Sequence, residues 1–572
     1  MMNYVQFLTE VDERISGCEE QVLRAFIHEL ARTWPEEERS SFLSTLGRII
    51  LVSAEDGSQK KEESEEFSDE REDFEDELAD LFERLEDIQD GNRSLDSEIN
   101  EEWDDWYNSD EEEFIFEDPE DILPDIEEAI ETLHDCLDRE AYEDGAVLGQ
   151  RLSELTVLVS GEYDDEMSLN DLFNHGLLEG DMSRIMREAV YLSYMGNEEE
   201  DRAEAMVTVM EGFNFFSFTL EDILRMGREE IELKAFLPSW IEALSGSISK
   251  SAEPLLIEAL HMLEDKESIL TYARRFADTY PNLYKSILEE GIPGVGDEEL
   301  LSIGLQSLTE VPDKSQVKSE IALLCAGYAL REGDIFVAED CWMEAFRCAP
   351  SVSGFLRLRL ESRHYEDYAG KIREAYESYF ASKGDWAGRG LALFLYFDGR
   401  FEEMIRRFMN AGNGIGWSST FMKQGISLLL MLLYGRGEYR RGMAAMREKA
   451  LYACSFSKEA YCLGTEVSSE ISNGEFFQDC FDRWKASLSI SEEQAKAWLD
   501  QIDRWILLRV EAIMNANKRN YYEECAGFVA AYGEVLESRG EAGATLRVLR
   551  QFKMLYPRRR AFHQEMQAFG LR

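Results

Sequence analysis

Proline and histidine are scarce in this chain of 572 residues, which contains 10 prolines and 6 histidines. Proline interrupts helices because it lacks a backbone N–H and clashes with the preceding turn, so its scarcity permits long helices. Good helix formers such as Leu, Glu, Ala and Arg recur at helical spacing, and strict alternation of β-branched residues is rare. The composition therefore predicts an almost wholly α-helical fold.

Positive charge is also in short supply. The 59 lysines and arginines stand against 118 aspartates and glutamates, which gives a formal net charge of −59. Because phosphate backbones and anionic lipid surfaces are bound through Lys and Arg, this balance argues against direct nucleic-acid binding and against a membrane surface. It favours basic partners, cations or simple solubility.

Long apolar runs are missing. The longest extends from Leu428 to Tyr434, whereas a bilayer-spanning helix needs about 20 apolar residues. No apolar segment follows a basic N-terminus, as it does in a signal peptide, so we expect a cytoplasmic protein. The nine cysteines form no CxxC or CxC pair, and we expect small buried side chains in a reducing compartment.

Catalytic and metal-binding motifs are absent from the sequence. It has no phosphate-binding loop, no HExxH pair and no GxSxG elbow. His134 is the histidine with both a cysteine and acids nearby, but on a helix His134 and Cys136 point about 200° apart and cannot hold one ion. We therefore expect no catalysis, no cofactor and no metal site; an enzyme of unknown type remains the third alternative.

Composition divides the chain into four parts. The predicted parts are an N-terminal helical module at 1–52, an acidic linker at 53–117, and two helical repeat regions at 118–310 and 311–572. Within the linker, residues 53–72 combine many charges with a single aromatic side chain, which indicates disorder, and residues 73–89 have the apolar period of an amphipathic helix.

Aromatic side chains stand among the acids of residues 91–117. They are Trp103, Trp106, Tyr107, Phe114 and Phe116. Solubility explains the acids but not the aromatics, because exposed aromatic side chains reduce solubility. Two alternatives account for them: they pack against the protein's own helices, or they anchor in a basic partner that the acids attract.

One stretch, from Ser319 to Pro350, resembles a tetratricopeptide repeat. The residues that carry the resemblance are the small residues Ala326, Ala338 and Ala345, the turn at Gly333 and Asp334, the large aromatic Trp342, and Pro350 after the second helix. Ala322 and Ala326 stand where that family has Trp and Gly in its first helix. Similar polar turns recur near Gly399, Gly437 and Asn520. The resemblance implies an all-α protein in which helix pairs stack into an α-solenoid.

A broader resemblance concerns two regions, Leu137–Leu158 with the following Gly161–Asp165, and the C-terminal Leu546–Phe569. Both are similar to the helical parts that flank SWIM-type zinc fingers in bacterial proteins. The zinc finger itself is missing, so the metal and any nucleic-acid role of that family are not implied.

These features favour a non-catalytic scaffold for protein–protein interaction that uses a solenoid groove and the acidic aromatic segment. The expected partner is a protein that is basic or presents a helix or peptide. The alternative is an acidic decoy or inhibitor of a basic nucleic-acid-binding protein. At the C-terminus the charge reverses, and these bases either form a polar cap paired with the chain's own acids or a handle for an acidic partner.

Overall fold

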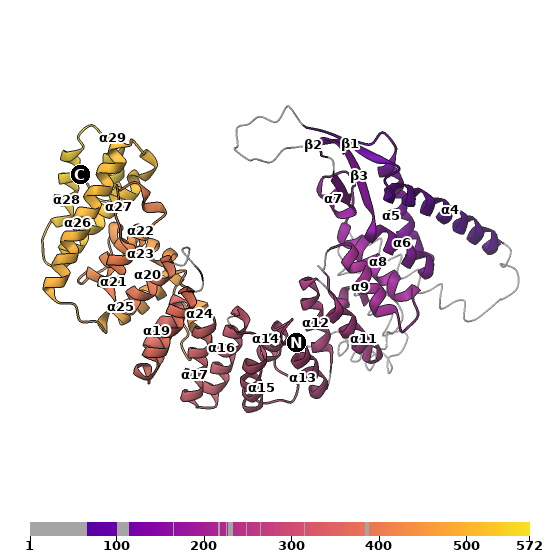
Figure 1. Ribbon diagram of the computed structural model, residues 1–572, viewed down its shortest axis with the longest axis horizontal. Helices are drawn as coiled ribbons and strands as arrows, with labels where there is room; N and C mark the ends of the chain where they lie inside the picture. The colour runs from indigo at the N-terminus through magenta and orange to yellow at the C-terminus, as the bar shows by residue number, and fades with distance from the viewer. Residues whose placement is uncertain are drawn as a thin grey trace, which may run out of the picture. The chain divides into compact units, whose positions relative to one another are not determined.

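The computed structural model shows a mostly helical protein, as the composition predicts (Figure 1). The residues it describes are 66–99, 114–163, 165–214, 218–224, 226, 233–247, 249–263, 265–313, 315–381, 383 and 388–571. The expected module at 1–52, and Trp103, Trp106 and Tyr107, lie outside these residues. The chain divides into two compact units, Met1–Tyr272 and Ala273–Arg572.

The first unit begins, in its described part, with the long helix α4 (Glu66–Gln89), which covers the whole of the amphipathic stretch expected at 73–89. Its buried face is formed by Phe74, Leu78, Leu81, Leu85 and Ile88. Arg84 ties α4 to α5 (Ile122–Asp138) through Glu128, at 2.8 Å, and through Asp125. The apolar period therefore places one face of α4 against its neighbours.

A small sheet, which the sequence did not predict, follows α4. It is formed by β1 (Ser94–Ile99), β2 (Phe114–Glu117), β3 (Thr156–Gly161) and β4 (Asp165–Ser168), in the order β2-β1-β3-β4. The pair β1–β3 is parallel, and the other two pairs are antiparallel. The prediction of an almost wholly helical protein missed these four strands, because runs of four to six residues are too short to carry a clear periodic signal.

The other helices that the structure describes in the first unit pack mainly against one another, and α7 contacts β4. They are α6 (Tyr142–Glu154), α7 (Leu169–Asn174), α8 (Met182–Gly196), α9 (Arg202–Gly212), α10 (Leu220–Leu224), α11 (Leu233–Gly246) and α12 (Glu253–Met262), and α13 (Lys266–Arg275) crosses the boundary of the units. Helices α6 and α8 approach closely, since a Cβ on Gly149 would lie 2.9 Å from the Cβ of Ala189. Small residues allow this crossing.

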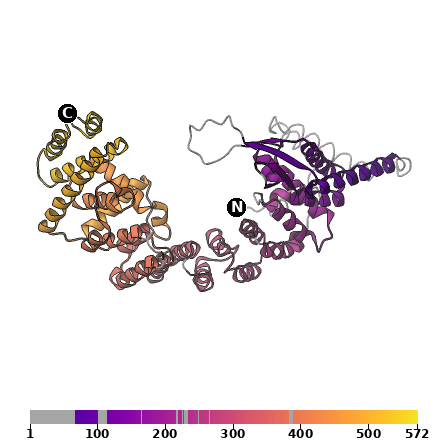
Figure 2. The same ribbon diagram turned by 45° about the horizontal axis from the view of Figure 1, so that its top comes forward.

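The second unit is helical throughout its described residues. Its helices are α14 (Asn282–Glu290), α15 (Asp297–Glu310), α16 (Gln316–Arg331), α17 (Ile335–Cys348), α18 (Val352–Glu361), α19 (Tyr365–Ala381), α20 (Gly388–Phe397), α21 (Phe401–Phe408), α22 (Met422–Leu433), α23 (Arg441–Cys454), α24 (Lys458–Cys462), α25 (Asn473–Ala486), α26 (Glu492–Asn515), α27 (Tyr522–Ser538), α28 (Ala544–Leu555) and α29 (Arg560–Ala568). Successive helices from α14 to α18 contact one another, and α27 contacts α22, α23, α26, α28 and α29. Figure 2 shows the same helices from a second side, coloured through orange to yellow along the second unit.

Helices α16 and α17 contain the residues that resemble the tetratricopeptide repeat. Ala326 and Ala338 are fully buried, and Ala345 is nearly so. Gly333, at φ +80°, reverses the chain between the helices, and the Asp334 carboxylate accepts a hydrogen bond from the Val337 N–H at the start of α17. Pro350 lies between the end of α17 and the start of α18.

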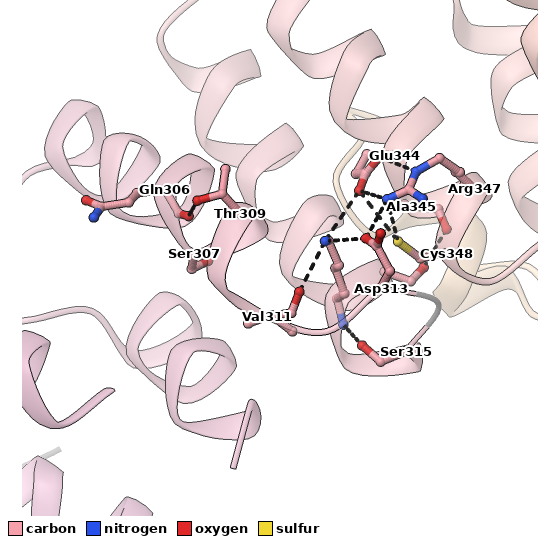
Figure 3. A network of polar contacts seen from close by, with 12 residues as sticks. Gln306, Ser307, Thr309, Val311, Asp313, Ser315, Glu344, Ala345, Arg347 and Cys348 are labelled. Carbon is pink, nitrogen blue, oxygen red and sulfur yellow. Dashed lines mark hydrogen bonds and ion pairs between the residues drawn. The ribbon is translucent and has the colours of Figure 1, made fainter. Parts of the chain in front are cut away.

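A buried lysine fastens this hairpin to the preceding loop (Figure 3). The Lys318 ammonium, only 5% exposed, donates to Asp313, at 2.7 Å, and to the Val311 carbonyl, at 3.2 Å. Arg347 also binds Asp313, at 2.8 Å, and pairs with Glu344. These two cations hold the pKa of Asp313 at about 2. The ionised carboxylate thus links α16 to α17.

Candidate docking surface at the end of the sheet

No group of three His, Cys, Asp or Glu side chains that could hold a metal ion occurs among the described residues. His134 contacts Glu188, which is 2% exposed and also accepts from Arg184 at 2.7 Å. Cys136 is buried, and burial raises the pKa of its thiol to about 12. The side chains of His134 and Cys136 therefore point to different surroundings, as their spacing on the helix predicts.

None of the cysteines that the structure describes forms a disulfide. Seven are buried and Cys462 is half-buried, while Cys18 lies outside the described residues. The prediction of small buried side chains is confirmed for these seven. In the same described ranges, no helix is both long enough and apolar enough to cross a membrane.

Four aromatic rings gather at one end of the sheet, and we call them the aromatic surface: Phe114, Phe116, Tyr163 and His175. The Tyr163 ring lies 5.2 Å from Phe114 and 5.6 Å from Phe116 in edge-to-face geometry. The His175 ring lies 5.2 Å from Phe116. Such geometry is the favourable one for aromatic pairs, because ring edges are positive and ring faces negative.

Strand pairing places the two phenylalanines side by side. Phe116 is opposite Ser97 of β1 and Phe114 is opposite Ile99. Successive side chains of a strand point to opposite faces, so Phe114 and Phe116 share one face while Ile115 points to the other. Ile115 is 51% exposed. The register of β1 and β2 therefore decides which residues join the aromatic surface.

The turn after β3 brings Tyr163 to the same place. The buried Ser97 hydroxyl donates to the Ser160 carbonyl, at 2.7 Å, and accepts from the Tyr163 N–H, at 3.0 Å. Gly161 has φ +96°, and a Cβ there would lie 2.2 Å from the Ser97 carbonyl oxygen. Only glycine permits both this backbone conformation and this close approach.

Helix α7 supplies the fourth ring. Ser168 and Asp171 form a reciprocal capping box at its N-terminus, and the His175 N–H closes its C-terminus by donating to the Asp171 and Phe173 carbonyls. Gly176, at φ +69°, then turns the chain away. These local bonds hold the backbone of His175, and its side chain is exposed beside Phe116.

The aromatic surface is partly open to solvent and has acids at one edge. Phe114, Phe116 and Tyr163 are half-buried. The exposed carboxylates beside Tyr163 are Glu162 and Asp165, whereas the register turns Asp96, Glu98, Glu117 and Glu166 to the opposite face of the sheet. None of these carboxylates forms an ion pair within the part of the chain that the structure describes. Ring faces and unpaired carboxylates together suit a Lys or Arg side chain, through cation–π and ionic attraction.

Sequence reasoning found half of this surface. It singled out Phe114 and Phe116, which the structure brings together, but not Tyr163 or His175. Tyr163 stands in the acidic segment Gly161–Asp165, which resembles part of a helical region but connects the strands β3 and β4. An aromatic residue between acids was the available signal there, whereas nothing in the sequence around His175 marks it.

Another part of the chain lies against the hairpin formed by α16 and α17. The Trp342 indole N–H donates to the Gly464 carbonyl at 2.7 Å, and Arg357 donates to the Ala460 and Leu463 carbonyls. A Cβ on Gly464 would lie 2.2 Å from the Leu323 carbonyl oxygen. A pocket of about 600 Å³ remains between α14, α16 and residues Leu463–Glu466. Trp342 therefore binds this chain's own backbone.

No protein-family model, no curated protein and no solved structure matches this chain. The described residues define a mostly helical protein with a small mixed sheet. Its function has to be argued from the geometry of its own surfaces.

Proposed function

We propose that this protein is a non-catalytic scaffold for protein–protein interaction, and that its aromatic surface binds a basic segment of a partner. The observation that carries the proposal is the cluster of Phe114, Phe116, Tyr163 and His175, held by β1, the β3–β4 turn and α7, with the unpaired carboxylates of Glu162 and Asp165 beside Tyr163. Rigid aromatic side chains that are only partly buried are typical anchors of protein interfaces.

The helical repeats support this proposal. The hairpin α16–α17 has the small residues, the Gly333 turn and the Trp342 of a tetratricopeptide-like unit, and we propose that such pairs stack as a solenoid. Repeat arrays commonly present binding surfaces rather than catalytic sites. Because residues Ala460–Gly464 bind to α17 and α18 here, we place partner binding at the aromatic surface and not at this hairpin.

The acidic charge favours a second candidate, an acidic decoy or inhibitor that occupies the basic site of a nucleic-acid-binding protein. The observation in its favour is the excess of carboxylates, 118 against 59 bases. The two candidates differ in their dependence on salt. A decoy held by charge loses affinity steeply as ionic strength rises, whereas contacts with aromatic rings persist.

The test compares the full chain with the variant Phe114→Ala, Phe116→Ala, Tyr163→Ala. A partner captured by the wild-type chain is purified and titrated calorimetrically against both. We expect the variant to bind at least about 10-fold more weakly, because anchor residues typically contribute more than about 1 kcal/mol each. A protein that binds both equally well would overturn the proposal.

A matched control uses the other face of the same sheet. Ile115 and Leu158 are exposed there, at 51% and 38%. The variant Ile115→Ala, Leu158→Ala removes similar apolar area without touching the aromatic surface, and we expect unchanged affinity. Titration at low and at high salt then separates the scaffold from the decoy.

A further inference from the structure

The last two helices reverse the charge of the chain. Residues 544–571 contain Arg547, Arg550, Lys553, Arg558, Arg559 and Arg560 against the single acid Glu565. A basic cluster in a chain of net charge −59 is open to two explanations. It is either a cap that pairs with the chain's own acids, or a surface that attracts an acidic partner.

The ion pairs of these helices distinguish the two explanations. Arg547 pairs with Glu541, and Arg559 donates to the Asn517 side chain and to the Met514 carbonyl. The side chains of Arg550, Lys553, Arg558 and Arg560 form no hydrogen bond or ion pair over the described ranges, and all four are exposed. A cap would pair its bases with neighbouring acids, so these four are not explained by capping.

Apolar side chains are exposed among the free bases. Met554 is 74% exposed and Leu555 is 52% exposed, although α28 has buried its apolar face through Val548, Leu549 and Phe552. Arg550 and Met554 are four residues apart, so they share one exposed face at the end of the helix, and Lys553 and Leu555 flank that face on opposite sides. We call Arg550, Lys553, Met554, Leu555 and Arg558 the basic stripe.

We propose that the basic stripe is a docking surface for an acidic segment of a protein partner, with an apolar side chain of that segment seated on Met554 and Leu555. Charge complementarity selects an acidic occupant, because the stripe carries three bases without partners. The apolar pair selects a protein segment over a nucleic acid, since phosphates gain nothing from methionine and leucine. A long polyanion is further disfavoured by repulsion from the rest of the chain.

The test measures fluorescence anisotropy of a labelled synthetic peptide with the full chain at low and at moderate salt. The peptide has about a dozen residues, in which glutamates surround two leucines and a tryptophan. A second peptide replaces these three by serine, and an oligothymidylate of equal length tests nucleic acid. We expect saturable binding of the first peptide, with Kd of roughly 10 μM, and weaker binding of the other two probes.

Variants locate the site. The double charge reversal Arg550→Glu, Arg558→Glu should weaken binding of the peptide at least about 10-fold, because it removes the attraction to the glutamates. The double variant Met554→Gln, Leu555→Gln should weaken binding about 3- to 10-fold, because it removes the apolar contact with the peptide. The matched control is Arg436→Glu, Lys518→Glu, which reverses the same amount of charge at exposed side chains of the same unit. This control should bind within about twofold of the wild type.

Each other outcome overturns the proposal. The absence of saturable binding, equal losses in the stripe and control variants, or tighter binding of the oligothymidylate would show that the stripe does not select an acidic protein segment. Equal binding of the two peptides would remove the apolar anchor. Circular dichroism of each variant confirms that it is folded before binding is compared.

Discussion

The aromatic surface and the basic stripe carry opposite charge and are built in opposite ways. The aromatic surface needs four elements, β1, β2, the β3–β4 turn and α7, and two of its rings lie on a strand whose register is set by β1. The basic stripe needs only α28 and the turn that follows it. The net charge of −59 agrees with the acids beside the aromatic surface but gives no sign of the basic stripe.

The two surfaces depend on different kinds of contact: the basic stripe on residues close together in the sequence, and the aromatic surface on pairing between distant strands. A helix places side chains from its own period, so Arg550 and Met554 would stay neighbours in any fold that keeps α28 helical, and Arg558 follows in the turn after α28. The aromatic surface exists only while β1 pairs with both β2 and β3, because Ser97 touches residues on both sides of it. Changes to backbone packing should therefore destroy the aromatic surface and leave the basic stripe intact.

The largest effect should come from Gly161→Val. This change adds a β-branched side chain at φ +96°, where a Cβ would lie 2.2 Å from the Ser97 carbonyl oxygen. We expect the free energy of unfolding of the first unit to fall by about 3 kcal/mol, the sum of backbone strain and overpacking. Urea denaturation combined with hydrogen exchange of β1 and β3 measures it.

The control for this change is Gly176→Val. Gly176 also has positive φ, +69°, but nothing lies within 4 Å of a Cβ there. It should cost only the backbone strain, about 1–2 kcal/mol. Equal losses at Gly161 and Gly176 would show that the close approach to Ser97 has no role.

Ala338→Leu should have the next largest effect on the free energy of unfolding, and this effect should be confined to the second unit. Ala338 is fully buried between α16 and α17. Leucine would overpack this crossing and lower the free energy of unfolding by about 1–3 kcal/mol. The control Ala497→Leu, on an exposed position of α26, should change stability by less than about 0.5 kcal/mol. An unaltered melting temperature for Ala338→Leu would mean that α16 and α17 do not cross at this residue.

Ser97→Ala tests the bonds that hold the aromatic surface. It removes the acceptor of the Tyr163 N–H and the donor to the Ser160 carbonyl, and it should destabilise the first unit by about 1–2 kcal/mol. Thr208→Ala, an exposed hydroxyl that bonds within its own helix, should cost less. If the two substitutions have equal effects in urea denaturation, Ser97 contributes no more than a surface hydroxyl.

Acid should weaken the second unit through Asp313. Its pKa is lowered to about 2 by Lys318 and Arg347, so its contribution to stability is present above the unfolded-state pKa of about 3.9 and is lost as the pH falls through about 2. The stability difference between the wild type and Asp313→Asn, measured by urea denaturation, should therefore shrink over this window. The effect should be small because the side chain is 64% exposed and solvent screens it. A difference independent of pH would contradict the ionic role of Asp313.

The smallest effect on stability should come from the basic stripe. Arg550→Gln and Met554→Gln remove exposed groups without intramolecular partners, so the free energy of unfolding should stay within about 0.5 kcal/mol of the wild type. A large loss from the stripe variants would make α28 a structural cap after all.

Phe114→Ala with Phe116→Ala, by contrast, should lower the stability of the first unit, because both rings contact Tyr163.

Much of the fold was predictable because helices depend on neighbours in the sequence. The period of Leu78, Leu81 and Leu85 is enough to define the buried face of α4. The sheet was not predictable. Strand β1 pairs with β3, which is far away in the sequence, so that Ser94 lies opposite Leu158, and neither strand has a strong pattern of its own. Phe114, Phe116 and Tyr163 each stand among acids in the sequence, whereas only the fold brings His175 beside them.

The sequence by itself determined the helical class, the acidic charge, the free thiols and the basic character of the C-terminal helices, since each is a property of composition or of local period. Tertiary structure alone decided which polar and aromatic residues meet. Trp342 reaches the Gly464 carbonyl across 122 residues, and Ser97 joins β2 to the β3–β4 turn. Contacts of this kind depend on packing between distant segments, which local propensity does not encode.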